Sequence, residues 1–137
     1  MTGPVLRKID AVTVPVPDLE RGLAYYRDRL GHPLLWRNDA IGQAGLGMPD
    51  SDTEIVLTTG LPYAPTWLVD DVDAAVASFD VVVTPAFDVP VGRCAVVEDA
   101  FGNRLALLDL STGLYVTDHN GSVTGVGTPP SEDLSDD

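Results

Sequence analysis

Apolar and polar residues alternate along most of this chain, and helical spacing interrupts the alternation twice. The first β-branched run is followed by Asp18, a residue type that often caps helices, and then by apolar residues at helical spacing up to Gly31, a typical helix stop. Three shorter apolar runs with turn residues between them come next. These patterns predict a strand, a helix and three further strands, at residues 9–16, 19–30, 33–37, 41–47 and 54–59.

The same order of elements repeats later in the chain. The alignment of residues 16–26 with residues 69–79 preserves both the cap and the apolar helix positions. In this alignment Asp18 falls on Asp71. The second unit is predicted to hold a strand, a helix and three strands, at residues 65–69, 72–79, 81–84, 92–98 and 104–110.

Two such units predict an α+β fold in which two βαβββ modules form curved mixed sheets around a shared cleft. The modules cover about residues 8–60 and 64–112, within one domain at 8–112. Residues 118–137 are acidic, contain neither Lys nor Arg, and end in a run rich in Pro, Ser and Asp. They are predicted to form an acidic, disordered tail, because such a composition cannot bury enough apolar surface to fold.

Composition narrows the possible functions. The chain has 21 Asp and Glu against 8 Lys and Arg, a formal net charge of -13, which argues against binding to nucleic acid or to anionic membranes. The single cysteine, Cys94, excludes an internal disulfide and is interpreted as a small buried residue. No apolar segment is long enough to cross a membrane, and no signal-like core follows the N-terminus, so a cytoplasmic location is expected.

Two segments resemble a known superfamily. The run 9–31, which contains Val-Pro-Val-Pro-Asp-Leu-Glu-Arg-Gly, is similar to the opening of vicinal oxygen chelate domains, the glyoxalase/bleomycin resistance protein/dioxygenase superfamily. The run 91–107 resembles its closing stretch, although Ala100 stands where the usual Asp-Pro-x-Gly-Asn pattern has proline. The resemblance covers about residues 8–112 and implies the two-module fold and pairing of two chains into a homodimer.

Metal-dependent members of this superfamily hold a divalent ion in the cleft with His, Gln or Glu side chains, two from each module. The resemblance implies that these four positions fall here on Ala11, Val56, Ala64 (or, after a slip of one residue, Pro65) and Ala106. None of these side chains has a donor atom, and a divalent ion needs several oxygen or nitrogen ligands. The chain is therefore expected to bind no metal there and to need no cofactor, as in the metal-free, bleomycin-resistance-like members.

A cleft with aromatic walls and a few polar groups is typical of small-molecule sites. Glu54 shares a strand face with Val56 and is the one carboxylate placed in the cleft, where aromatic faces nearby would favour a ligand cation. Trp67 is interpreted as a core residue, and the glycines between residues 42 and 47 as positions of close approach by a ligand or strand. The candidate ligand-binding residues are Thr13, Trp36, Gln43, Glu54, Tyr63, Thr66 and Arg93, of which Arg93 has pairing with a nearby acid as an alternative.

Three functions stay open at this point. The first is a metal-independent protein that binds a small molecule, either an antibiotic that it sequesters or a metabolite. The second is a metal-independent enzyme of the lyase or isomerase type, with Glu54 as general base; a metal-dependent glyoxalase or dioxygenase is disfavoured. The third is an interaction module whose cleft is vestigial.

Overall fold

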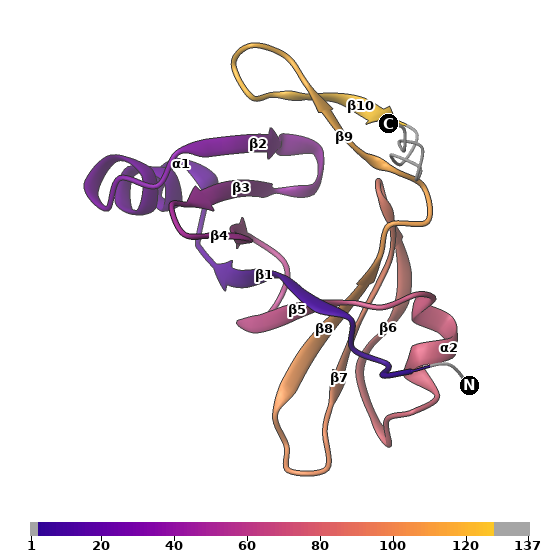
Figure 1. Ribbon diagram of the computed structural model, residues 1–137. Coiled ribbons are helices and arrows are strands. Elements are labelled where there is room, and N and C mark those ends of the chain that lie inside the picture. The colour runs from indigo at the N-terminus through magenta and orange to yellow at the C-terminus, as the bar shows by residue number, and fades with distance from the viewer. Residues whose placement is uncertain (1–2, 128–137) are drawn as a thin grey trace.

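The computed structural model describes residues 3–127, in which two similar modules follow each other (Figure 1). The first module contains β1 (Lys8–Pro15), α1 (Leu19–Leu23), the π-helical segment η1 (Ala24–Arg29), β2 (Leu34–Asn38), the 3-10 turn η2 (Asp39–Ile41), β3 (Gln43–Met48) and β4 (Ser51–Thr58). The second module contains β5 (Ala64–Leu68), α2 (Val72–Val76), β6 (Val81–Val89), β7 (Gly92–Glu98) and β8 (Arg104–Asp109). Within residues 3–127 no helix has the length and apolar character that a membrane span requires.

Each module contributes four neighbouring strands to one eight-stranded sheet, with the order β2-β3-β4-β1-β5-β8-β7-β6. In both modules the first strand pairs in parallel with the last, and the remaining pairs are antiparallel. β1 and β5 pair antiparallel and thereby join the modules within one chain. The predicted α+β fold with two βαβββ modules is confirmed, and the mixed sheet is strongly curled (Figure 1).

One strand is longer than its pattern indicates. The sequence predicts a strand at residues 81–84, yet β6 continues through Pro85, which has no N–H to donate, to Val89. β6 is the last strand of the sheet, and an edge strand tolerates proline because one of its sides needs no hydrogen-bond partner.

A separate hydrophobic cluster lies beneath the helix of each module. Leu23 of α1 packs against Leu57 of β4, and Val72 of α2 packs against Leu107 of β8. All four side chains are almost completely shielded from solvent, and each contributes about 1.5–3 kcal/mol to stability through burial. Trp67 packs at the margin of the second cluster, which confirms its interpretation as a core residue.

Asp18 and Asp71 cap the two helices in the same way. The Asp18 carboxylate accepts a hydrogen bond from the Arg21 N–H at 2.8 Å, and the Asp71 carboxylate accepts one from the Ala74 N–H at 3.0 Å. In each case the donor lies three residues after the cap, the usual geometry of an N-cap. The equivalence of the two caps in the repeat is therefore confirmed.

The chain continues after the second module into a hairpin of β9 (Leu114–Thr117) and β10 (Val123–Gly127). The hairpin lies next to β2, where the Arg37 N–H donates to the Gly121 carbonyl at 2.8 Å and Arg37 forms a bridge with Ser122. In Figure 1 it is the yellow segment beside β2.

The hairpin corrects the predicted disordered tail over 118–137: residues 118–127 are structured, and residues 128–137 lie outside the described part. The Asp118 carboxylate organises the turn by accepting hydrogen bonds from the Asn120 N–H at 2.8 Å and the Ser122 N–H at 3.1 Å. Polar turn residues of this kind have the composition of an unstructured segment, so composition alone gives the wrong answer here.

Candidate functional site

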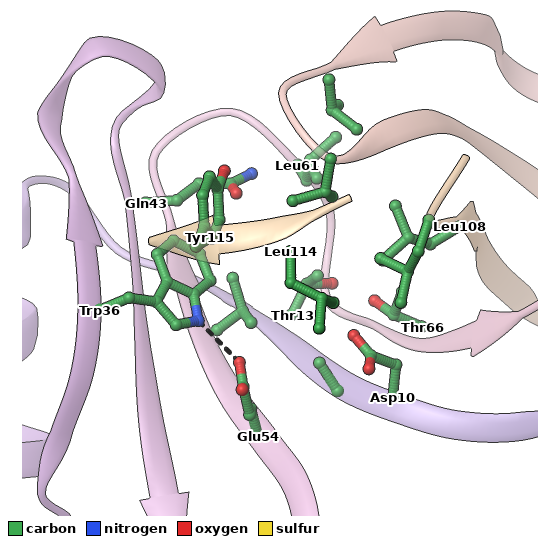
Figure 2. A pocket seen from close by; sticks show the side chains of 15 residues that line it. Asp10, Thr13, Trp36, Gln43, Glu54, Leu61, Thr66, Leu108, Leu114 and Tyr115 are labelled. Carbon is green, nitrogen blue, oxygen red and sulfur yellow. Dashed lines mark hydrogen bonds between the residues drawn. The ribbon is translucent and has the colours of Figure 1, made fainter. Parts of the chain in front are cut away.

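A pocket of about 310 Å³ lies where the two modules meet (Figure 2). On β4, Val56 lines the pocket while its neighbour Leu57 packs under α1; on β8, Leu108 lines it while Leu107 packs under α2. Because neighbouring strand residues point to opposite faces, the pocket occupies the sheet face opposite the helices. Most of its wall is aliphatic or aromatic, as in typical small-molecule sites.

The pairing of β1 with its two neighbours fixes the centre of the pocket. Ala11 is paired with Glu54 of β4 on one side and with Thr66 of β5 on the other. Thr66 is paired in turn with Ala106 of β8. Paired residues on adjacent strands point to the same face, so these side chains share one surface of the sheet.

Trp36 and Tyr115 form an aromatic wall. The Trp36 Nε1–H donates to Glu54 Oε1 at 2.8 Å, and the centroids of the Trp36 and Tyr115 rings lie 4.7 Å apart at an interplanar angle of 44°. The indole lies over Gly45 of β3, so the close approach inferred for this glycine is made by Trp36. Tyr115 comes from β9, which sequence reasoning left outside the domain; its Oη accepts a hydrogen bond from Asn38 Nδ2 at 3.4 Å.

Two carboxylates, those of Glu54 and Asp10, line the pocket. Burial raises the pKa of Glu54, the hydrogen bond from Trp36 lowers it in part, and the negative charge of Asp10 raises it further. Burial also raises the pKa of Asp10, opposed by the positive charge of Lys8. Within residues 3–127 the Asp10 carboxylate accepts no hydrogen bond and forms no ion pair. Both groups are therefore less acidic than usual and are available to a ligand.

Asp10 is a site residue that sequence reasoning missed. Strict alternation along β1 places Asp10 on the face opposite Ala11, but the pairing of β1 with β5 shifts its register between Ile9 and Ala11. Such a β-bulge redirects the side chain at the irregular position. It brings Asp10 and Ala11 to the same pocket, and no glycine or proline in the sequence marks it.

Replacement of Asp10 by Asn is expected to stabilise the protein at neutral pH by about 1 kcal/mol, because it removes a poorly solvated charge without a partner. The pKa of Asp10 is raised in the folded state, so its negative charge lowers the stability of the wild type. This loss of stability is complete above the folded-state pKa and disappears below the pKa of Asp in the unfolded chain. Urea unfolding at pH 7.5 and pH 3.5 measures this difference. An Asn variant that is less stable than wild type at pH 7.5 would contradict the assignment of Asp10 as an unpaired pocket carboxylate.

The neutral polar candidates differ in whether their hydrogen-bonding groups are already occupied. Thr13 Oγ1 lies 2.7 Å from the Pro62 carbonyl and 3.0 Å from the Ala64 carbonyl, so its hydroxyl proton is donated within the protein. Gln43 and Thr66 line the pocket. Thr66 is buried, and its Oγ1 has no hydrogen-bond partner among the described residues.

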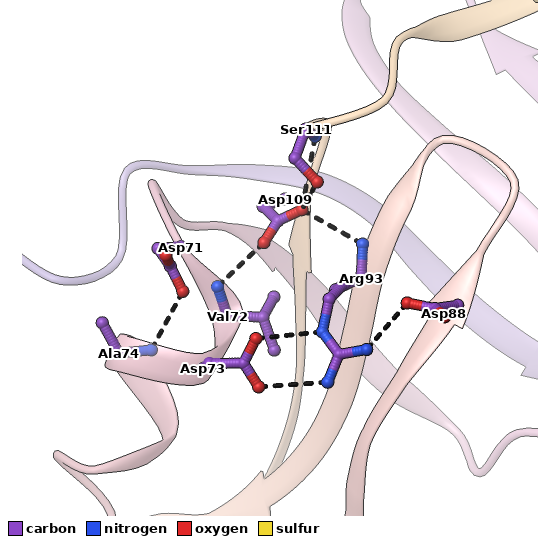
Figure 3. A network of polar contacts seen from close by, with 8 residues as sticks. All are labelled: Asp71, Val72, Asp73, Ala74, Asp88, Arg93, Asp109 and Ser111. Atoms are coloured by element: carbon purple, nitrogen blue, oxygen red, sulfur yellow. Dashed lines mark hydrogen bonds and ion pairs between the residues drawn. The ribbon is translucent and has the colours of Figure 1, made fainter.

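Two candidates do not reach the pocket, which corrects their assignment. Tyr63 is 67% exposed and lies at a different surface hollow, beside Trp67. Arg93 belongs to the network of Figure 3, in which its guanidinium donates to Asp73 at 3.0 and 3.1 Å and to Asp88 at 2.7 Å. The alternative of pairing with nearby acids is therefore observed, because two carboxylates hold this guanidinium outside the pocket.

The residues at the implied metal positions do not fit a divalent ion. Ala11 and Val56 line the pocket, and Ala64 and Ala106 are buried in β5 and β8, each with a hydrocarbon side chain. Among residues 3–127 no three His, Cys, Asp or Glu side chains gather closely enough to hold a metal. The donor set near the pocket centre thus consists of the two carboxylates and the neutral polar groups described above.

Comparison with known proteins agrees with this architecture. The family model of the Glyoxalase/Bleomycin resistance protein/Dioxygenase superfamily matches residues 8–107. No curated protein matches the chain in sequence.

Solved structures of similar fold include two epimerases. Methylmalonyl-CoA epimerase from Mycobacterium tuberculosis is 23% identical, with a TM-score of 0.58 over 80% of this chain and 91% of that chain. A variant of the Streptomyces coelicolor enzyme, in complex with 2-nitronate-propionyl-CoA, is 20% identical, with a TM-score of 0.56 over 76% of this chain and 97% of that chain. At these identities the likeness shows the fold alone.

A third similar structure is that of TnmS3, an antibiotic-binding protein from Streptomyces sp. CB03234. Its sequence is 27% identical to this one, and the match covers 79% of this chain and 99% of the TnmS3 chain. The TM-score of 0.38 is too low to support an inference. The family match, by contrast, spans both modules, and the sheet order and the equivalent helix caps agree with it. The chain therefore belongs to the Glyoxalase/Bleomycin resistance protein/Dioxygenase superfamily.

Proposed function

We propose that this protein binds a small organic molecule in the pocket between its modules, without a metal ion. The main support is the pocket itself, an open space of about 310 Å³ with an apolar wall and a few polar groups directed into it. The hydrocarbon side chains at the implied metal positions support the metal-independent part of the proposal. An antibiotic and a metabolite are both compatible with this chemistry.

Native mass spectrometry of the purified protein, followed by calorimetry against a panel of metabolites and antibiotics, tests the proposal. We expect a 1:1 complex with a dissociation constant in the micromolar range, and less than about one tenth of an equivalent of any transition metal after dialysis. Near-stoichiometric metal in the pocket would overturn the metal-independent part. Binding no tighter than millimolar across the panel would overturn the whole proposal.

A matched pair of variants locates the binding site. Val56→Phe places a larger side chain in the pocket and is expected to abolish binding, whereas Val82→Phe adds the same group at an exposed position of β6 and is expected to leave it unchanged. Circular dichroism confirms that both variants fold. Equal binding by the two variants would show that the ligand lies elsewhere.

A second candidate function is a metal-independent lyase or isomerase in which Glu54 removes a proton from the substrate. The half-buried position of Glu54 and its raised pKa favour this candidate, because a general base works best with a pKa near the working pH. Turnover of a bound ligand by wild type, and its loss in Glu54→Gln with binding retained, would establish the enzyme. An interaction module with a vestigial cleft has less support, since the cleft is not filled by the protein's own side chains.

A homodimer and a cytoplasmic location remain predictions from the sequence and the resemblance. Sedimentation velocity at several protein concentrations tests the first of these.

A further inference from the structure

The charged side chains that line the pocket are both negative, although the positive charge of Lys8, which is not among the lining residues, also acts on Asp10. Asp10 and Glu54 line it, and none of the described residues that line it is Lys, Arg or His. The guanidinium of Arg37, the residue that follows Trp36, is engaged by Glu20 and Asp39. A pocket with this charge pattern repels anions and attracts cations.

The two carboxylates point into the same space. Glu54 is paired with Ala11, the residue that follows Asp10, and Figure 2 shows both acids on one side of the pocket, below Leu114. Their charges influence each other, because the negative charge of Asp10 raises the pKa of Glu54. The Trp36 N–H neutralises neither of them, since it is an uncharged donor to Glu54 alone. A positive group between the two carboxylates would relieve both their repulsion and their incomplete solvation.

An independent observation points to a ligand at the same place. The Thr66 side chain is only 5% exposed, and its Oγ1 has no partner among residues 3–127, although a buried hydroxyl without a hydrogen bond costs about 1–3 kcal/mol. Figure 2 shows Thr66 beside Asp10 on the pocket floor. Its oxygen is closed off from solvent as the side chain stands, and a rotation about the Thr66 Cα–Cβ bond would let it accept a hydrogen bond from a ligand N–H in the pocket.

The rest of the wall accepts an apolar group. Trp36 and Tyr115 present aromatic surface, and Leu108 and Leu114 add aliphatic surface. Aromatic faces also attract cations, which reinforces the preference of the carboxylates. At about 310 Å³ the pocket is at the small end of the range for ligand sites.

Building on the proposed function, we propose that the ligand is a small protonated amine. Its ammonium group lies between Asp10 and Glu54 and donates a hydrogen bond to Thr66 Oγ1, and its apolar part packs against Trp36 and Tyr115. A primary or secondary ammonium fits better than a quaternary one, because only the former has an N–H to donate.

Calorimetry with matched probes tests this assignment. The probes are 2-phenylethylamine, 2-phenylethanol, 3-phenylpropionate and phenethyltrimethylammonium, which share an aromatic ring and differ in charge and N–H content. We expect the amine to bind at least about tenfold more tightly than the alcohol, the carboxylate to bind most weakly, and the quaternary ammonium to fall between amine and alcohol.

Variants then assign the recognition to individual residues. Asp10→Asn and Glu54→Gln should each weaken binding of the amine by about three- to tenfold and leave binding of the alcohol within about twofold. Thr66→Val should weaken binding of the amine about threefold but not that of the quaternary ammonium. Asp88→Asn, which removes an exposed charge outside the pocket, is the control and should change neither. Asp10→Asn is especially informative, because we expect this variant to bind the amine more weakly than wild type and yet to unfold at a higher urea concentration. If Asp10 had a purely structural role, binding and stability would change in the same direction.

The outcomes separate this inference from the proposed function. If the amine binds no more tightly than the alcohol, or if the Asp10 and Glu54 variants bind it as wild type does, the ammonium assignment is wrong. If the ammonium assignment fails but Val56→Phe still abolishes binding of a compound from the metabolite and antibiotic panel, the proposed function stands and only the ammonium assignment is lost. If Val56→Phe leaves every binding event unchanged, both proposals fail.

Discussion

Replacement of Asp109 by Asn is expected to lower the free energy of unfolding at neutral pH by about 3 kcal/mol. Asp109 is buried at the end of β8 (Figure 3), where Oδ2 accepts a hydrogen bond from the Val72 N–H at 2.9 Å. Oδ1 accepts hydrogen bonds from the Arg93 N–H at 3.0 Å and from the Ser111 hydroxyl at 2.7 Å. An Asn side chain offers one oxygen and one NH2 group, so at least one of these donors would face another donor in a buried place.

The effect of Asp109→Asn should depend on pH. Burial acts to raise the pKa of Asp109, but the hydrogen bonds from Ser111, Val72 and Arg93 together outweigh it and lower the pKa. A carboxylate with a lowered folded-state pKa stabilises the protein fully above the pKa of the unfolded chain, about 3.9 for Asp, and loses this contribution as the pH falls toward the folded-state value. Wild type and variant should therefore become more alike in stability below about pH 3.9.

Urea unfolding monitored by circular dichroism, at pH 7.5 and at pH 3, measures both effects. Asp88→Asn is the matched control, since it removes a carboxylate from the same network at an exposed position and should change stability little. A loss of similar size in the two variants would show that Asp109 is not the centre of the network.

Much of the fold follows from periodicity. The repeat between the modules preserves the caps Asp18 and Asp71, and both form the predicted hydrogen bond. Period-two alternation on β1 and β4 correctly places Thr13 and Glu54 at the pocket. These features are local, because a cap or a strand face depends on a few neighbouring residues.

The parts that sequence reasoning missed depend on contacts between distant segments. Asp10 enters the pocket through a bulge that exists only in the pairing of β1 with β5. Tyr115 reaches the pocket because the hairpin lies next to β2, some eighty residues earlier in the chain. Arg93 has chemistry suited to a ligand site, but it is paired with Asp109 on the face of the sheet that α2 covers, and there Asp73 of α2 and Asp88 of β6 hold its guanidinium. Which acid forms an ion pair with an arginine depends on tertiary packing, and a local sequence pattern does not predict it.

Gly45 shows how a backbone position can control the site, and Gly45→Ala is expected to disrupt it. A Cβ atom at Gly45 would lie 2.1 Å from Trp36 Nε1 and 2.4 Å from Trp36 Cε2, far inside van der Waals contact. The indole has to move, and its position is held by the hydrogen bond to Glu54 and by the ring of Tyr115. We expect a loss of about 2 kcal/mol of stability, the usual size for an overpacked site, together with displacement of the aromatic wall.

Tryptophan fluorescence reports the displacement directly. The chain has two tryptophans, so a Trp67→Phe background leaves Trp36 as the single reporter. The replacement breaks no hydrogen bond, because the Trp67 indole N–H has no partner among the described residues. In this background Gly45→Ala should shift the emission to longer wavelength and increase quenching by acrylamide, because the indole moves toward solvent. Gly60→Ala is the matched control, since a Cβ atom there meets no other atom within 4 Å. An unchanged spectrum in Gly45→Ala would mean that β3 can yield instead of Trp36, and the aromatic wall would then not depend on this glycine.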